Sequence, residues 1–234
     1  MPLSMDREDL IEERAIAITL TDDNYIRHVP VESFRIQNRG GKGLKGVATK
    51  DEDSPQSIVT CFSKDRLLIF TNLGRVYGLK AWETPQGSRH SRGTHIRNLL
   101  ENLQEDEDIV SILPISKDIV DEVTEKCLKV KLEEGEKRPS SGYFLLFATK
   151  LGLIKKTDLH EYVRINRNGK YALRFKLEND SLVNVQQSVD TDDVVMISTT
   201  GYASRFKCEA IRTSGRVSGG VYGIKVADRK GSGG

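Results

Sequence analysis

Residues 37–43 form a glycine-rich basic heptad whose side chains could bind an anionic ligand. The heptad reads QNRGGKG, with Arg39 and Lys42 set among glycines and amides, and Lys45 follows shortly after it. Glycine lets the backbone approach a ligand closely, and successive backbone N–H groups in such turns form anion-binding nests. Arginine and lysine supply the charge that phosphate oxygens attract. The heptad therefore predicts a loop that grips a polyanion, but a solvated surface loop could have the same composition.

The same loop recurs along the chain, each time after a short β-hairpin pattern. Two apolar runs flank a tight turn, as in residues 15–30, and this arrangement is typical of a hairpin. The hairpins repeat at spacings of 50, 78 and 49 residues, marked by turn residues and by a preceding hydroxyl residue. The turn residues are Asn24, Gly74, Gly152 and Gly201, and the hydroxyl residues are Thr21, Thr71, Thr149 and Ser198. In this register Arg39 corresponds to Arg89, Arg167 and Arg216, and Lys42 corresponds to Arg92, Lys170 and Gly219.

A period near 50 residues with about four strands per unit predicts an all-β radial array of blades. We expect residues 15–228 to form it, with blades starting near residues 15, 65, 142 and 192 and the last blade incomplete. Residues 1–14 are expected to be an acidic lead-in and residues 229–234 a flexible tail. The spacing of 78 indicates an insertion at residues 116–141, and the alternation of residues 127–132 predicts an extra strand or hairpin there.

Charge is distributed unevenly, although the net charge is only +2. Residues 33–46 carry four basic side chains and no acid, whereas residues 101–108 carry five acids and no base. We interpret the acidic run 105–108 as a solvated corner between strands, and Tyr77 and Trp82 as packing residues.

The sequence offers no convincing catalytic or metal site. The four histidines lack metal-ligand spacing, and the glycine-rich heptad lacks the spacing of a P-loop. Three cysteines are too few and too scattered for a disulfide framework, which favours a reducing cytosolic compartment. Neither a signal peptide nor a membrane-spanning run is evident. We therefore expect no catalytic residue, no metal and no cofactor.

Equivalent loops in a radial array lie along one rim, so their arginines predict a curved basic stripe. Such a stripe suits a bent DNA duplex that is held by its phosphates without base readout. The loops hold few aromatic residues, which disfavours single-strand stacking. A propeller-like protein-interaction module is the alternative from a different functional class.

The heptad resembles the seven-residue box of the gyrase A C-terminal domain, in the type IIA topoisomerase family. That box normally reads QRRGGKG or QRRGGRG. Residues 71–77 and 220–225 are also similar to stretches of this DNA gyrase domain, and the resemblance covers about residues 9–228 without the insertion. Asn38 departs from the family by replacing an arginine. The family's disc usually has about six blades, whereas this chain supplies four, so it is either truncated or a short variant. The C-terminal domain of topoisomerase IV, whose box is degraded, is the alternative within the class.

The resemblance implies a β-pinwheel, a propeller-like disc in which neighbouring blades exchange strands. It implies a non-enzymatic domain that wraps duplex DNA, supports negative supercoiling by the holoenzyme and works with the remaining domains of gyrase A and with gyrase B. It also implies a cytoplasmic, nucleoid-associated protein without a membrane. The expected DNA-binding residues are Arg35, Gln37, Asn38, Arg39, Gly40, Gly41, Lys42, Gly43, Lys45, Arg89, His90, Arg92, Arg167, Lys170 and Arg216.

Overall fold

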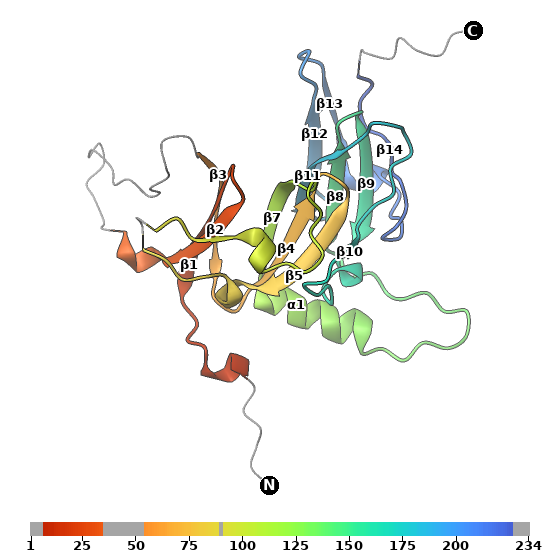
Figure 1. The fold of residues 1–234 in the computed structure, drawn as a ribbon. Coiled ribbons are helices and arrows are strands. Elements are labelled where there is room, and N and C mark those ends of the chain that lie inside the picture. Colours follow the sequence, from red (N-terminus) through yellow and green to blue (C-terminus); the bar gives the residue numbers. More distant parts are fainter. Residues whose placement is uncertain (1–6, 35–53, 89–90, 227–234) are drawn as a thin grey trace, which may run out of the picture.

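The computed structural model describes residues 7–34, 54–88 and 91–226 and shows an all-β array of sheets (Figure 1). The strands are β1 (Ala15–Thr21), β2 (Tyr25–Pro30), β3 (Pro55–Phe62), β4 (Arg66–Thr71), β5 (Arg75–Lys80), β6 (Thr94–His95), β7 (Ile109–Ile115), β8 (Phe144–Thr149), β9 (Leu153–Asp158), β10 (Lys170–Tyr171), β11 (Leu182–Ser188), β12 (Asp193–Ile197), β13 (Ala203–Lys207) and β14 (Val221–Tyr222). The helical segments are α1 (Lys117–Val123), the π turn η5 (Thr124–Leu128) and the 3-10 turns η1 (Arg7–Leu10), η2 (Val31–Ser33), η3 (Ala81–Glu83), η4 (Ile96–Asn98), η6 (Leu159–Glu161) and η7 (Cys208–Ala210).

Neighbouring repeats exchange strands. The sheets have the orders β3-β1-β2-β6, β10-β5-β4-β7 and β11-β8-β9-β14, and a fourth sheet in the described part contains β12 and β13. We call these blades one to four. In each of the first three blades, one edge strand (β6, β10 or β14) comes from the following repeat. The all-β prediction and the strand exchange of the predicted pinwheel are therefore confirmed.

The four hairpins share one turn chemistry. The turn residue has a positive φ in every case, from 61° at Asn24 to 86° at Gly201, a region that glycine and asparagine tolerate. The hydroxyl residue at the end of the first strand accepts a hydrogen bond from the backbone N–H four residues later. These N–O distances lie between 3.0 and 3.3 Å for Thr21, Thr71, Thr149 and Ser198. The hairpin register predicted from the sequence is confirmed.

Apolar side chains fill the spaces between successive blades. Residues of blades one and two form one core cluster, and residues of blades two and three form another. The second cluster includes an aromatic trio, in which the ring centroids of Phe70 and Phe147 are 5.5 Å apart and those of Phe147 and Tyr162 are 5.7 Å apart. Such contacts add to the stabilisation from buried area. Packing between blades therefore holds the array together.

The insertion is helical over residues 117–128 and has no strand in its remainder, so the predicted strand or hairpin at residues 127–132 is wrong. Ser116 caps α1, because its Oγ accepts a hydrogen bond from the Ile119 N–H at 3.3 Å. Val123 and Cys127 lie four residues apart and are both buried in the core between blades two and three, below which α1 lies in Figure 1. A helical apolar period therefore outweighs the short alternation.

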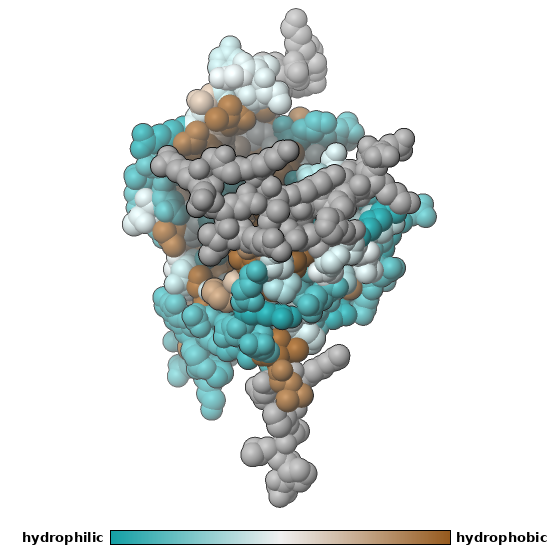
Figure 2. Space-filling view, turned by 90° about the vertical axis from the view of Figure 1, so that its left-hand side faces the viewer, coloured by the Kyte–Doolittle hydropathy of each residue, from teal (hydrophilic) through white to brown (hydrophobic). Residues whose placement is uncertain are grey.

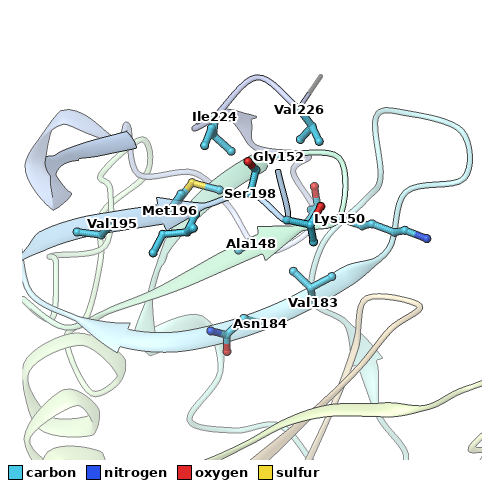
Figure 3. A pocket seen from close by; sticks show the side chains of 13 residues that line it. Ala148, Lys150, Gly152, Val183, Asn184, Val195, Met196, Ser198, Ile224 and Val226 are labelled. Atoms are coloured by element: carbon cyan, nitrogen blue, oxygen red, sulfur yellow. The ribbon is translucent and has the colours of Figure 1, made fainter. Parts of the chain in front are cut away.

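Blade four has two strands in the described part of the chain. Beside it, a surface hollow of about 410 Å³ separates blades three and four (Figure 3). Val183, Val195, Met196 and Ile224 are among its lining residues, and Lys150 extends away from it. Polar residues such as Asn184, Ser198 and Thr199 also line this mainly apolar hollow.

Candidate nucleic-acid interface

The exchanged strands lie on the outer edges of the blades. At the opposite edges, β3, β7 and β11 contact one another across neighbouring blades. Gln56 Nε2 donates to the Ile109 carbonyl at 3.0 Å, and Ser111 Oγ donates to the Val185 carbonyl at 3.2 Å. These bonds place the inner edges together, so β6, β10 and β14 face outward. The loops that lead into these three strands therefore lie on the perimeter, which we call the rim.

A glycine precedes each exchanged strand and has a positive φ: Gly93 (87°), Gly169 (71°) and Gly220 (58°). A Cβ on Gly93 would lie 2.5 Å from the Ile26 carbonyl oxygen, and one on Gly169 would lie 2.5 Å from Tyr77 Cε1. The loop backbone thus crosses closely over the preceding blade, and only glycine fits there. This close approach fixes each rim loop against its neighbour.

The exchanged strands correct the register that was predicted for the loops. Tyr171 pairs with Arg75 as His95 pairs with Tyr25, so Lys170 occupies the position of Thr94. The equivalent of Arg92 is therefore Asn168, because each directly precedes the glycine. The loop at residues 159–169 is two residues shorter than the loop at 81–93. The predicted equivalence of Arg92 and Lys170 is wrong, although both lie on the rim.

The four predicted cations in the described loops differ in their surroundings. Arg92 Nη2 lies 3.2 Å from Asp23 Oδ2, and its guanidinium carbon is 3.7 Å from the centroid of the Tyr25 ring. Arg167 Nη2 lies 2.6 Å from Glu83 Oε1. All of these pairs are partly open to solvent, so an incoming anion could compete with the carboxylates.

Arg216 and Lys170 complete the set. Arg216 Nη1 donates to the Tyr171 carbonyl at 2.5 Å, which ties the loop before β14 to β10, and Lys170 is exposed. The remaining predicted site residues lie outside the described residues, and their roles stay predictions. They are Arg35, Gln37, Asn38, Arg39, Gly40, Gly41, Lys42, Gly43, Lys45, Arg89 and His90.

Sequence reasoning missed further cations that the fold brings to the rim. Arg164 and Arg212 are exposed in the loops before β10 and β14, respectively. Lys176 Nζ donates to the Gly220 carbonyl, and the Arg174 carbonyl would lie 2.6 Å from a Cβ on Gly219. Arg164 and Arg212 could have been found from the sequence, because they lie in the repeated loops. Arg174 and Lys176 could not, because only strand exchange brings them to the next loop.

A buried side chain at one register position supports each loop. Arg27, Tyr77 and Lys155 occupy equivalent places in β2, β5 and β9 and are all buried. Arg27 Nη1 donates to Ser91 Oγ at 3.4 Å, and the Tyr77 ring lies below Gly169. Arg27, Tyr77 and Lys155 follow one another at 50 and 78 residues, the same spacings as the hairpins, so the sequence could have revealed them. Tyr77 is a packing residue, as predicted.

Lys155 supports the loop before β14 directly. Its Nζ donates to the Ala172 carbonyl at 2.5 Å and to the carbonyl of Arg216. Burial, and to a smaller extent the charge of Arg216, lower the pKa of Lys155 to about 7 against an opposing effect of Glu161. A buried amine thus holds the backbone of a predicted DNA-binding arginine.

The acidic corner is only partly solvated, which corrects the sequence interpretation. Glu107 is buried, and its carboxylate accepts hydrogen bonds from Thr71 Oγ1 at 2.6 Å and from Tyr77 OH at 3.0 Å. Burial and Glu107 together raise the pKa of Tyr77. Glu107 therefore secures blade two, while its three acidic neighbours Glu105, Asp106 and Asp108 are exposed.

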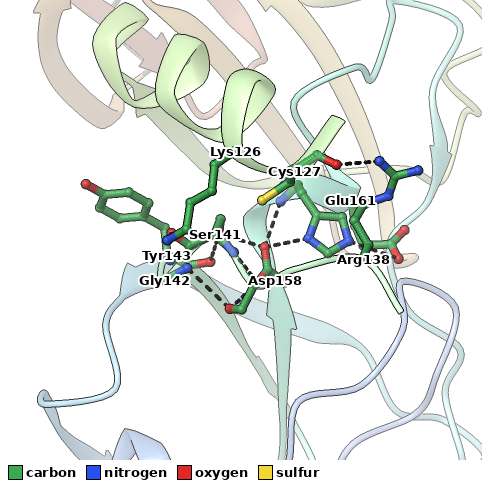
Figure 4. A network of polar contacts seen from close by, with 10 residues as sticks. Lys126, Cys127, Arg138, Ser141, Gly142, Tyr143, Asp158 and Glu161 are labelled. Carbon is green, nitrogen blue, oxygen red and sulfur yellow. Dashed lines mark hydrogen bonds and ion pairs between the residues drawn. The ribbon is translucent and has the colours of Figure 1, made fainter. Parts of the chain in front are cut away.

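Ser141, His160 and Asp158 form a polar cluster below the helical part of the insertion (Figure 4). We assign this cluster a structural role. Ser141 Oγ and His160 Nδ1 lie 2.6 and 2.7 Å from the same atom, Asp158 Oδ1. Burial would raise the pKa of Asp158, but hydrogen bonds from His160, Ser140 and Ser141 outweigh it and hold the pKa well below its usual range. Ser141 and His160 both hydrogen-bond to the carboxylate of Asp158. A nucleophilic serine would instead need a hydrogen bond to the histidine that acts as its base.

Metal-binding clusters and membrane-spanning helices are both absent from the described residues. These residues contain no group of three histidine, cysteine or acidic side chains that could hold a metal ion. None of their helices has the length and apolar character to cross a bilayer. Cys61, Cys127 and Cys208 are free and buried, and burial raises the pKa of Cys61 to about 12. Viewed from the side of blade one, the surface is largely hydrophilic with smaller hydrophobic areas (Figure 2).

The fold and the loops define a strand-exchanged, propeller-like disc with cations along its outer edge. A sequence profile described as "DNA gyrase C-terminal domain, beta-propeller" matches residues 16–60, 65–116, 143–188 and 192–232, which is most of the chain. The chain belongs to the DNA gyrase C-terminal domain family. The resemblance suggested by the heptad is confirmed.

Two curated relatives support this assignment. The gyrase A protein of Staphylococcus epidermidis is 38% identical over 224 residues, and the match covers 96% of this chain and 23% of the relative. The gyrase A protein of Staphylococcus aureus (strain MRSA252) gives the same identity and coverage. The chain thus spans about a quarter of the length of the curated relatives it matches.

Solved structures share the fold. The crystal structure of the C-terminal domain of DNA topoisomerase IV superposes with a TM-score of 0.68 at 23% identity, covering 94% of this chain and 60% of the other. A DNA gyrase A C-terminal domain superposes with a TM-score of 0.66 at 20% identity, covering 92% and 62%. At these identities the likeness speaks for the architecture.

Proposed function

We propose that the chain binds duplex DNA by its phosphates along the rim and wraps it, as part of a DNA gyrase A protein. One observation carries the proposal: strand exchange puts cation-bearing loops on the outer edge of three successive blades. Arg92 lies on the first of these loops, Lys170 follows the second and Arg216 lies on the third. A curved row of cations suits the regular charge of a duplex.

Contact through phosphates makes the binding independent of base sequence. Phosphate contacts fix the position of a duplex, whereas bases are read in the grooves. Bending a site of tens of base pairs costs on the order of 1–6 kcal/mol, so several contacts have to act together. Phosphates would displace Asp23 from Arg92 and Glu83 from Arg167. Exposed ion pairs contribute only about 0–1 kcal/mol, so this exchange costs little.

In the whole protein, we propose that this wrapping supports negative supercoiling together with the remaining domains of gyrase A and with gyrase B. We also propose a cytoplasmic location on the bacterial nucleoid. The chain on its own is proposed to be an accessory, non-enzymatic domain. It should therefore hydrolyse no ATP above a contamination control, and turnover by the pure protein would contradict this part of the proposal.

Two other functions remain testable. A topoisomerase IV C-terminal domain shares the fold, but the named relatives at 38% identity are gyrase A proteins. A protein-interaction module predicts weak DNA binding that salt hardly affects. The dependence of affinity on salt therefore separates this module from DNA wrapping.

The experiment is a salt titration of duplex binding, monitored by fluorescence anisotropy with two unrelated sequences. We expect a slope of log K against log salt that is steeper than about −2, because each neutralised phosphate contributes about −0.9. The triple variant Arg92→Ala, Lys170→Ala and Arg216→Ala should flatten the slope by about 2–3. The matched control replaces Lys117 and Lys129, two exposed lysines of the insertion. A shallow parent slope, or equal losses in both variants, would contradict the proposal.

A further inference from the structure

Each exchanged strand presents an aromatic ring at one register position on the rim. His95, Tyr171 and Tyr222 are the second residues of β6, β10 and β14. Each pairs with the first residue of the neighbouring strand: Tyr25, Arg75 and Leu153, respectively. The row arises from strand pairing, because the intervals between the rings differ from the hairpin spacings. It therefore escapes a search by sequence period.

Two of these rings are largely open to solvent. Tyr171 is 61% exposed and Tyr222 is 50% exposed, whereas Tyr77 and Tyr162 in the core are fully buried. His95 is half-buried and packs edge-on against Tyr25, with ring centroids 5.3 Å apart. Large exposed aromatic side chains at equivalent places on successive blades indicate a surface that contacts a partner.

Cations lie close to the first two rings of the row, those of His95 and Tyr171. The Arg75 guanidinium carbon lies 5.9 Å from the Tyr171 ring centroid, and Arg216 donates to the Tyr171 carbonyl. Lys170 directly precedes Tyr171, and Arg92 covers the Tyr25 ring on which His95 packs. Apolar rings between cations complement a polymer with anionic phosphates and apolar sugars. The charge around the row therefore favours nucleic acid as its partner.

We propose that Tyr171 and Tyr222, with His95 in the first blade, pack against the deoxyriboses of the wrapped duplex between the phosphates held by the rim cations. This inference rests on the proposed function and adds a contact to it that is independent of salt. Proteins that bend DNA commonly press apolar side chains into the minor groove. The rings would thus secure the bent duplex at points where phosphate contacts alone leave it free to slide.

The test compares the double variant Tyr171→Ala and Tyr222→Ala with the parent in the same salt titration. We expect about tenfold weaker duplex binding, which corresponds to about 1.4 kcal/mol, with a slope changed by less than about one unit. The double variant with phenylalanine at both positions should bind like the parent, because the ring makes the contact. Phe62→Ala is the matched control, since Phe62 is 51% exposed but ends β3, at the edge of blade one opposite β6.

The outcomes separate this inference from the proposed function. If the parent binds with a steep slope and the double alanine variant binds equally well, the ring contact is refuted while DNA binding stands. An equal loss in the phenylalanine variant or in Phe62→Ala would also refute it. A loss seen with single-stranded DNA alone would assign the rings to base stacking and overturn the duplex contact. A shallow parent slope would instead refute the proposed function.

Discussion

Replacing Lys155 by methionine should remove a pH-dependent part of the stability of blades three and four. Lys155 is 1% exposed, and its Nζ donates to the carbonyls of Ala172 and Arg216. Methionine keeps an unbranched apolar chain but has neither charge nor donor. The Ala172 carbonyl keeps a second donor, Tyr162 OH at 3.1 Å, whereas the Arg216 carbonyl loses the bond from Lys155.

The magnitude depends on pH because the folded-state pKa of Lys155, about 7, lies below its ordinary value of 10.5. Between these values the unfolded chain binds more protons, so the stability of the parent rises with pH. The gain from pH 7 to pH 9 is about 2 kcal/mol at about 1.4 kcal/mol per unit, less near the midpoint. The lost donor at Arg216 adds a cost of about 1–3 kcal/mol. That cost applies at every pH, so the linkage predicts that the parent gains about 2 kcal/mol on the variant between pH 7 and pH 9.

Urea unfolding at pH 6.5, 8 and 9 measures this difference. Lys207→Met is the control, because Lys207 is exposed and pairs with Asp193 at 3.2 Å. Its stability should differ from that of the parent by less than about 1 kcal/mol at each pH, as for other exposed pairs. A constant gap between Lys155→Met and the parent across the three pH values would refute the reasoning.

Three further substitutions test the packing. Phe147→Ala should cost about 3–5 kcal/mol in urea unfolding, because it opens a cavity beside Phe70 and Tyr162, and a loss below about 1 kcal/mol would contradict a tight core there. Gly169→Ala should destabilise by more than about 1 kcal/mol, since its Cβ would meet Tyr77 at a positive φ; an unchanged midpoint would show that the loop can lift away. Asp158→Asn should lower the free energy of unfolding at pH 7. Because the folded-state pKa of Asp158 is depressed, the difference in stability from the parent should narrow as pH falls below about 4. A difference that stays the same between pH 7 and pH 3 would count against the network in Figure 4.

The hairpins could be predicted from the sequence because local chemistry fixes them. A hydroxyl residue followed three residues later by glycine or asparagine determines each turn, and both features are visible in the residue spacing. The radial arrangement followed from the repeat period. These features depend on residues close together in the chain.

Features that depend on distant residues could not be predicted. The two-residue shortening that separates Arg92 from Lys170 becomes visible only once β10 pairs with Arg75 and Val76. Glu107 belongs to an acidic run, and its burial follows from Thr71 and Tyr77, which lie on other strands. In the insertion, the sequence shows both an alternation over six residues and a helical apolar spacing. Only the core on which the apolar face of the helix packs decides between the two.

The most direct test of DNA wrapping is the linking number of closed circular DNA relaxed by a topoisomerase in the presence of the chain. We predict a shift of one sign that grows with bound protein and disappears in the triple variant of Arg92, Lys170 and Arg216. The insertion control at Lys117 and Lys129 should shift the topoisomers like the parent. Salt-sensitive binding without any shift in linking number would show that the rim cations hold the duplex without wrapping it and would contradict the account.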